Sequence, residues 1–217
     1  MIISHKHKFI YIRPTKTGSS SAHAMIADSG VLGDDDICSP LDEMEYKSNT
    51  RYNGHATMSE LNTLGLIDFD IEKRYTVLLT VRNPIDRFLS AFFFKTSLKG
   101  EESTLANLVK YIMTEKSLET CIGRSQFEYC RNIKQDGLIP NLTIIDTDDI
   151  DVALTKFIKS IGGSVKQKMR CKSDCGPGWA VHKYTNYLQP QVLEVLLSKL
   201  SKEIEFYNTI KREHSYV

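Results

Sequence analysis

A loop with one cation, one glycine and several hydroxyls follows the first apolar run of the chain. This stretch, the Lys16 loop, spans residues 13–21 and reads RPTKTGSSS. Backbone N–H groups at the start of a helix, together with the positive end of its dipole, bind phosphate-like oxygens, and Lys16 adds a full charge. The loop lacks the GxxxxGK(S/T) frame of a Walker A motif. It predicts an anion site, and the alternative is a Ser-capped helix start with no ligand.

A second candidate anion site lies further along the chain, in residues 82–90, the Arg82 segment. Arg82 follows an apolar run, and Ser90 comes two helical turns into the helix expected after it. A guanidinium fork and a hydroxyl that converge on one phosphate form charge-assisted, geometrically selective hydrogen bonds. The alternative is an arginine paired with Asp86 and a serine on an ordinary helix surface.

A candidate general base, His55, stands between these two segments. Residues 57–60 read TMSE and fit a capping box, so a short helix is expected to begin just after the histidine. Imidazole is the natural general base near neutral pH, and the turn that Gly54 begins leaves it accessible. Glu60 and Asp86 are the other possible bases, each with a capping role. A histidine that hydrogen-bonds its own loop is the alternative.

These side chains need elements that bring them together. Strand patterns alternate with helix patterns along the chain, and the Arg82 segment has a good N-cap in Asn83 and a good first helical residue in Pro84. Strands are expected at 9–12, 75–81 and 142–145, and helices at 19–28, 105–118, 148–161 and, as one long amphipathic helix, 189–207.

Recurrent strand–helix units predict an α/β fold with three layers, in which helices flank a mainly parallel central sheet. The length of 217 residues suits one domain, residues 1–217. Ligands of such sheets bind beyond the carboxyl ends of the strands, where Lys16 and Arg82 both fall. The sequence therefore predicts one composite anion site at that edge.

Taken together, the two segments resemble the family of sulfotransferases that use 3′-phosphoadenosine 5′-phosphosulfate (PAPS). Residues 16–20 are similar to the family's 5′-phosphosulfate loop, although Thr15 stands where the family has proline, and the Arg82 segment is similar to its 3′-phosphate element. The resemblance implies a P-loop-like sulfotransferase fold, PAPS as co-substrate and no metal. The nucleotide-binding residues that it implies are Lys16, Thr17, Gly18, Ser19, Ser20, Arg82 and Ser90.

The carbohydrate branch of the family, typical of the Golgi, is the more similar one. Gly54 and His55 resemble the segment that carries the catalytic histidine of heparan 2-O-sulfotransferases. Small-molecule sulfotransferases carry a tryptophan soon after the phosphosulfate loop, whereas the only tryptophan here is Trp179. The resemblance implies in-line transfer to a carbohydrate hydroxyl, with Lys16 and His55 as catalytic residues and 3′-phosphoadenosine 5′-phosphate (PAP) as product.

The composition indicates which classes of partner and which compartment suit this chain. The formal net charge of +1 provides no global field to gather nucleic acid, and 41% hydrophobic with 25% charged residues is typical of a soluble globular protein. The apolar run at 9–12 is too short for a signal peptide or a membrane span, so a cytoplasmic protein without an integral membrane segment is expected. The oligomeric state is unknown from the sequence.

Five cysteines, an odd number, are expected to be reduced thiols in such a compartment. A local disulfide or half of a metal site between Cys171 and Cys175 is the alternative. The other three are Cys38, Cys121 and Cys130.

Two rival functions stay open at this point. One is a metal-dependent phosphotransferase or nucleotide kinase, for which Asp146 and Asp148 could supply carboxylates after a strand. The other is a non-catalytic nucleotide-binding module. Lys183 and Tyr184 are candidates to complete the nucleotide site, and the basic cluster within 166–172 could hold an anionic glycan or form a solvated face.

Overall fold

The computed structural model describes residues 1–39, 54–100, 102, 104–115, 118, 122–165 and 188–214. These residues form a five-stranded sheet with the strand order β3-β1-β2-β4-β5. The strands are β1 (Ile2–Ser4), β2 (Phe9–Ile12), β3 (Ile37–Cys38), β4 (Thr76–Val81) and β5 (Leu142–Asp146).

The sheet is mixed rather than mainly parallel. β2, β4 and β5 run parallel, as expected, but β1 is antiparallel to both β2 and β3. β1 reaches β2 through a short turn in which Lys8 has a φ of 53°, and so short a connection can join only antiparallel strands. Two- and three-residue strands carry too little periodicity to be recognised in a sequence, which is why β1 and β3 were not expected.

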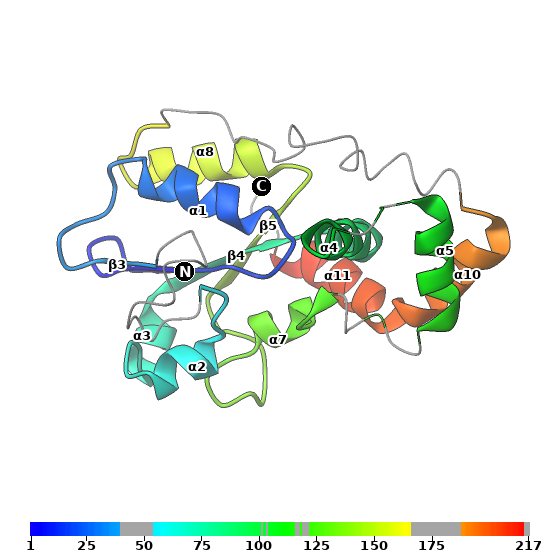
Figure 1. Ribbon diagram of the computed structural model, residues 1–217. Helices are drawn as coiled ribbons and strands as arrows, with labels where there is room; N and C mark the ends of the chain where they lie inside the picture. The colour runs from blue at the N-terminus through cyan, green and yellow to red at the C-terminus, as the bar shows by residue number, and fades with distance from the viewer. Residues whose placement is uncertain are drawn as a thin grey trace.

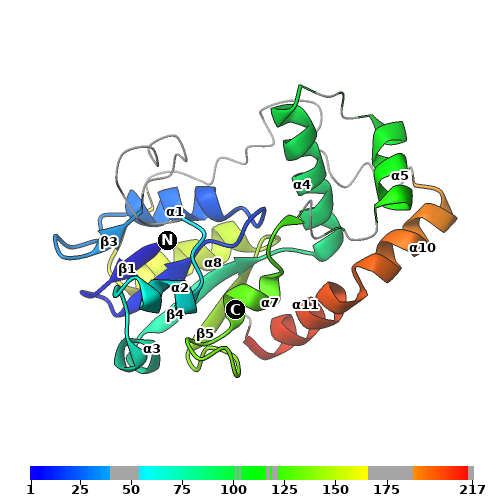
Figure 2. The same ribbon diagram turned by 60° about the horizontal axis from the view of Figure 1, so that its bottom comes forward.

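Helices cover both faces of the sheet, so the expected three layers are present (Figure 1). One face carries α1 (Ser19–Ala27) and α8 (Ile150–Ser160). The opposite face carries α2 (Met58–Thr63), α3 (Phe69–Arg74), α7 (Gln126–Cys130) and α11 (Ser201–His214). A third group packs together beyond the end of the sheet: α4 (Pro84–Leu98), α5 (Leu105–Thr114) and α10 (Pro190–Lys199) (Figure 2).

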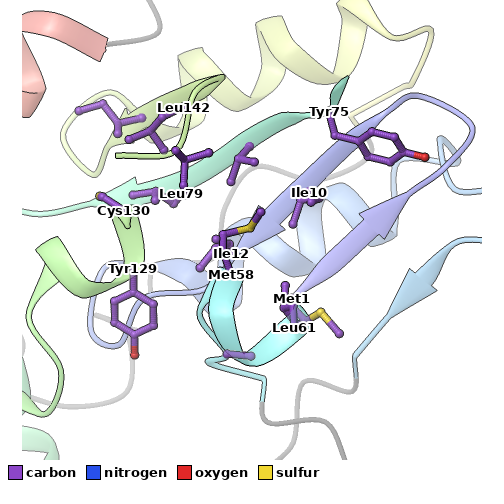
Figure 3. Packing of buried hydrophobic residues seen from close by; sticks show 14 of the residues in the cluster. Met1, Ile10, Ile12, Met58, Leu61, Tyr75, Leu79, Tyr129, Cys130 and Leu142 are labelled. Carbon is purple, nitrogen blue, oxygen red and sulfur yellow. The ribbon is translucent and has the colours of Figure 1, made fainter. Parts of the chain in front are cut away.

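Alternate residues of the central strands enter different apolar cores, because successive side chains of a strand point to opposite faces. Ile10 and Ile12 of β2 pack with Met58 and Leu61 of α2 (Figure 3). Phe9, also in β2, packs on the opposite face, in the core that α1 and α8 cover. Both faces of β2 are therefore buried, and the strand holds the Lys16 loop at a fixed place.

The predicted long helix over 189–207 is two helices, α10 and α11. The backbone leaves the helical region at Leu200, which has φ −100° and ψ 5°. Leu196 and Leu200 pack in the core formed with α4 and α5, whereas Tyr207 and Ile210 pack under the sheet. One apolar stripe predicted one helix, but the two ends of the stripe pack in two different cores.

Several local expectations are confirmed. Thr57 and Glu60 form the capping box of α2, and Gly65, with a φ of 70°, follows that helix. The side chain of Asn83 caps α4, which begins at Pro84.

None of the helices in the described ranges has the length and apolar character needed to cross a bilayer.

Cys38 and Cys130, the cysteines that the structure describes, are free thiols. Other features of the sequence lie outside the described residues. The undescribed features are Cys121, Cys171, Cys175, Trp179, Lys183, Tyr184 and the basic cluster within 166–172.

Candidate active site

The Lys16 loop turns sharply between β2 and α1. Lys16 and Gly18 both have left-handed backbone conformations, with φ of 62° and 69°, a conformation that glycine adopts without a side-chain penalty. The hydroxyls of Thr17 and Ser19 both donate to the carbonyl of Pro14, at 2.9 and 2.8 Å. These two bonds fold the loop back on itself at the start of α1.

The start of α1 suits an anion. Its N-cap is Gly18, and no side chain in the described part of the chain caps it. The serine cap in the alternative explanation of this loop is therefore wrong. The first N–H groups of a helix need acceptors, and an anionic ligand can supply them.

A hydroxyl on the neighbouring strand supports the loop. Thr80 of β4 is fully buried, and its Oγ1 lies 2.8 Å from Oγ1 of Thr17 and 3.4 Å from the phenol oxygen of Tyr11. Tyr11 also donates to the carbonyl of Ser19, at 3.2 Å. Buried polar groups of this kind pair with one another and give a unique geometry. Thr80 and Tyr11 were missed because each residue type is ordinary in a strand. The feature that could have indicated this role is Thr80, a polar residue inside the apolar run VLLTV.

The Arg82 segment starts where β4 ends. Asn83 accepts from the backbone N–H of Ile85 at 3.0 Å, and α4 begins at Pro84. Ser90 lies two turns into α4 and is buried. Because β2 and β4 are adjacent and parallel, the Lys16 loop and the Arg82 segment follow strands that end at the same edge of the sheet.

Helix α4 contacts the Lys16 loop directly. The Lys16 ammonium lies over the ring of Phe94, 4.0 Å from its centroid. Phe94 follows Ser90 by one helical turn, so both side chains project from the same face of α4. A cation–π contact at a partly exposed ring is worth about 0.5–1 kcal/mol, enough to orient a lysine and weak enough to yield to an anion.

His55 lies beside the entry to the Lys16 loop. Its Nδ1 is 2.6 Å from the carbonyl oxygen of Arg13, the residue that follows β2. A carbonyl can only accept, so Nδ1 carries the hydrogen and Nε2 of the neutral ring has the lone pair. This bond joins His55 to a distant loop rather than to its own, and it selects the tautomer that a general base needs.

Glu60 is less suited than His55 to take a proton. Arg124 donates to Oε2 of Glu60 at 2.6 Å and also to Oε1, and the N–H of Thr57 donates to Oε2 at 2.9 Å. The hydrogen bond from Arg124 lowers the pKa of the Glu60 carboxyl. Asp86, the other alternative, occupies the first turn of α4, where a negative charge favours the helix.

Asp146 is engaged in holding α11 against β5. Its Oδ2 accepts from the phenol of Tyr207 at 2.5 Å and from the Lys211 ammonium at 2.8 Å, while its Oδ1 accepts from the N–H of Asp148 at 3.0 Å. Across the described ranges, no three histidine, cysteine or acidic side chains gather as metal ligands. The contacts of Asp146 give it a structural role.

Comparison with known proteins adds an independent finding. A family model described as the sulfotransferase family matches residues 1–138. The matched part includes the Lys16 loop, His55 and the Arg82 segment. Neither the curated proteins nor the solved structures contain a significant match. Because the family model covers more than half of the 217 residues, this chain belongs to the sulfotransferase family.

Proposed function

We propose that this protein is a transferase that moves the sulfuryl group of PAPS to an acceptor hydroxyl. Sulfuryl transfer is the reaction of its family, which in general uses PAPS. The observation that supports the proposal best is the meeting of three features near one edge of the sheet. These features are the start of α1, which no described side chain caps, the Arg82 segment on the adjacent strand, and His55 bonded to Arg13.

In the proposed complex, the 5′-phosphosulfate of PAPS binds residues 16–20 and the 3′-phosphate binds Arg82 and Ser90. In the proposal, the phosphosulfate oxygens lie at the start of α1, where the left-handed turn at Lys16 and Gly18 ends and no described side chain caps the helix. The guanidinium of Arg82 and the hydroxyl of Ser90 supply charge-assisted hydrogen bonds to the 3′-phosphate.

The proposed reaction is a single in-line step. Nε2 of His55 takes the proton of the acceptor hydroxyl while the acceptor oxygen forms a bond to sulfur. The bond between sulfur and the 5′-phosphate oxygen breaks, and PAP leaves with that electron pair. Lys16 and the loop N–H groups stabilise the negative charge that grows on the leaving oxygen. Catalysis is then mainly positioning and preorganised electrostatics, with neither a covalent enzyme intermediate nor a metal ion in the step.

We further propose a carbohydrate or glycoconjugate as the acceptor. This part of the proposal rests on the resemblance of Gly54 and His55 to the catalytic segment of the carbohydrate branch. A glycan hydroxyl must lose its proton as it attacks sulfur, and His55 is the general base proposed to take that proton.

Replacing His55 with glutamine is expected to lower the turnover number by about 10²- to 10⁴-fold, the usual contribution of a general base. The measurement is the initial rate of transfer from radiolabelled PAPS to a panel of neutral and anionic oligosaccharides, in the presence of EDTA. Glu60→Gln is the control, because glutamine still completes the capping box, and its rate should stay within about threefold.

Three results would contradict parts of the proposal: one from this assay, one from a titration with PAP, and one from an assay with ATP and Mg²⁺. If Glu60→Gln loses the rate and His55→Gln keeps it, the base is wrongly assigned. Tight PAP binding without transfer to any acceptor identifies a non-catalytic nucleotide-binding module. A phosphoryl-transfer activity that requires Mg²⁺, in place of sulfuryl transfer, identifies the phosphotransferase.

Replacing Phe94 with leucine is expected to lower the turnover number by about two- to fivefold, because Lys16 loses a contact worth about 0.5–1 kcal/mol that orients it. Phe94→Tyr keeps a ring and should restore the rate. Leu98→Ala, at an exposed position one turn further along α4, is the control for an effect on the helix alone. Equal rates in Phe94→Leu and the wild type would show that the ring does not orient Lys16.

A further inference from the structure

A buried arginine joins the Lys16 loop to helices far from it in sequence. The side chain of Arg87, in the first turns of α4, has no exposed surface. Its Nε donates to the carbonyl of Thr15 at 2.9 Å, and its Nη2 donates to the hydroxyl of Thr15 at 3.1 Å and to the carbonyl of Arg124 at 2.5 Å. Thr15 directly precedes Lys16, so Arg87 fixes the chain at the point where the left-handed turn begins.

The charge of Arg87 is balanced from the C-terminal helix. Its Nη1 donates to Oε1 of Glu203, in the first turn of α11, at 2.8 Å. The same carboxylate oxygen accepts the backbone N–H of Gln126 at 2.8 Å. Glu203 therefore holds both Arg87 and the start of α7.

Gln126 in turn holds the backbone of Arg82. The N–H of Arg82 donates to Oε1 of Gln126 at 2.8 Å, and Nε2 of Gln126 donates to the carbonyl of Arg82 at 3.0 Å. Gln126 is fully buried. Its amide pairs with Arg82 as a neighbouring strand would, and it leaves the guanidinium of Arg82 out of the pairing.

We propose that Arg87, Glu203 and Gln126 are positioning residues that set the separation of the Lys16 loop from the Arg82 segment and so preorganise the site for both ends of PAPS. They touch neither the nucleotide nor the acceptor. Their contacts run from Thr15 through Arg87, Glu203 and Gln126 to Arg82. This inference rests on the proposed function, since it assigns a role in binding that same nucleotide.

Preorganisation of the site matters because PAPS must bind two loops, on different strands, at the same time. A ligand that bridges two sites binds tightly only if their separation is already correct, because ordering them on binding costs affinity. The sheet fixes where β2 and β4 end, but the loops beyond them need their own constraint. Glu203 lies beyond residues 1–138, so part of this constraint comes from a helix that the family model does not cover.

A double replacement separates positioning from simple stabilisation. Removing one partner of a buried ion pair leaves an uncompensated charge, so Arg87→Met alone should lower the melting temperature, by roughly 10 °C. Replacing both partners with apolar residues of similar volume is often neutral for stability. In Arg87→Met/Glu203→Met the melting temperature should therefore recover in part, because no unpaired charge is left, while the buried backbone groups of Thr15, Arg124 and Gln126 still lack the partners that held them.

The experiment measures PAP affinity by calorimetry, at a temperature where every variant is folded, together with the melting temperature. We expect the double variant to bind PAP at least about tenfold more weakly than the wild type, although it is more stable than Arg87→Met. The control is Asp146→Asn/Lys211→Met, which removes an ion pair between β5 and α11 and should bind PAP as the wild type does. Gln126→Met keeps the pair of Arg87 with Glu203 and provides a second test, with a similar loss of affinity expected, if the double variant does not fold.

The outcomes distinguish the two levels of the proposal. If the wild type does not bind PAP, the proposed function fails. If the wild type binds PAP and both the double variant and Gln126→Met bind it equally well, the nucleotide site stands and the positioning role is wrong. Weaker binding in the control pair to the same extent would also overturn the positioning role, because any lost ion pair would then have the same effect.

Discussion

Replacing Lys16 with alanine is expected to lower the turnover number of sulfuryl transfer by roughly 10²- to 10³-fold, the usual effect of removing one preorganised group that stabilises transition-state charge. The affinity for PAP should change by less than about tenfold. The difference arises because negative charge on the oxygen between sulfur and phosphorus develops during the transfer step, and interactions that strengthen there raise the rate rather than the affinity.

The structure supports this division of roles for Lys16. The residue follows Thr15, which Arg87 holds, and its left-handed backbone places it at the turn before Gly18. Its ammonium lies over the ring of Phe94, a contact weak enough to yield to an oxyanion. The measurement is a comparison of single-turnover rates and PAP affinities for Lys16→Ala, with Lys99→Ala at the exposed end of α4 as control. Normal turnover in Lys16→Ala would contradict the assigned role.

Replacing Arg82 with alanine is expected to weaken PAP binding by roughly 100-fold, or about 2.7 kcal/mol, because a charge-assisted contact to the 3′-phosphate is lost. Ser90→Ala removes one neutral donor and should weaken binding by about fivefold. At saturating PAPS the turnover number of both variants should stay near that of the wild type. Gln126 holds the backbone of Arg82. Alanine at position 82 therefore removes the guanidinium without releasing the loop.

A ligand that lacks the 3′-phosphate makes this prediction specific. Adenosine 5′-phosphate should bind the wild type much more weakly than PAP does, and Arg82→Ala should leave its affinity almost unchanged. The pair of ligands and the pair of proteins form a thermodynamic cycle that isolates the contact between Arg82 and the 3′-phosphate. An equal loss of affinity for both ligands would place Arg82 elsewhere in the site.

Much of the fold followed from local patterns in the sequence. The apolar, β-branched runs at β2, β4 and β5 gave the three parallel strands, and Thr57, Asn83 and Pro84 marked two helix starts through their capping chemistry. β1 and β3 were too short to show a pattern, and the break between α10 and α11 comes where the chain passes from one apolar core to another. Such features depend on packing, which a local pattern does not contain.

The candidate site also contains residues that the sequence predicted and residues that it did not. Lys16, Gly18, His55 and Arg82 could be proposed because each residue type suits its chemistry at a strand or helix end. Ser90 could be proposed from its place two turns into the helix that follows Arg82. Their supporting residues could not. Thr80 reads as a strand residue, Gln126 as a helix surface residue and Glu203 as one acid among many, and only long-range contacts give them roles.

The most direct test of the account is a calorimetric titration of the purified protein with PAP, without added metal, beside a titration with ATP and Mg²⁺. The account predicts selective binding of PAP, with the affinity reduced in Arg82→Ala. Preferential binding of Mg²⁺-ATP would contradict the sulfotransferase mechanism and favour the phosphotransferase instead.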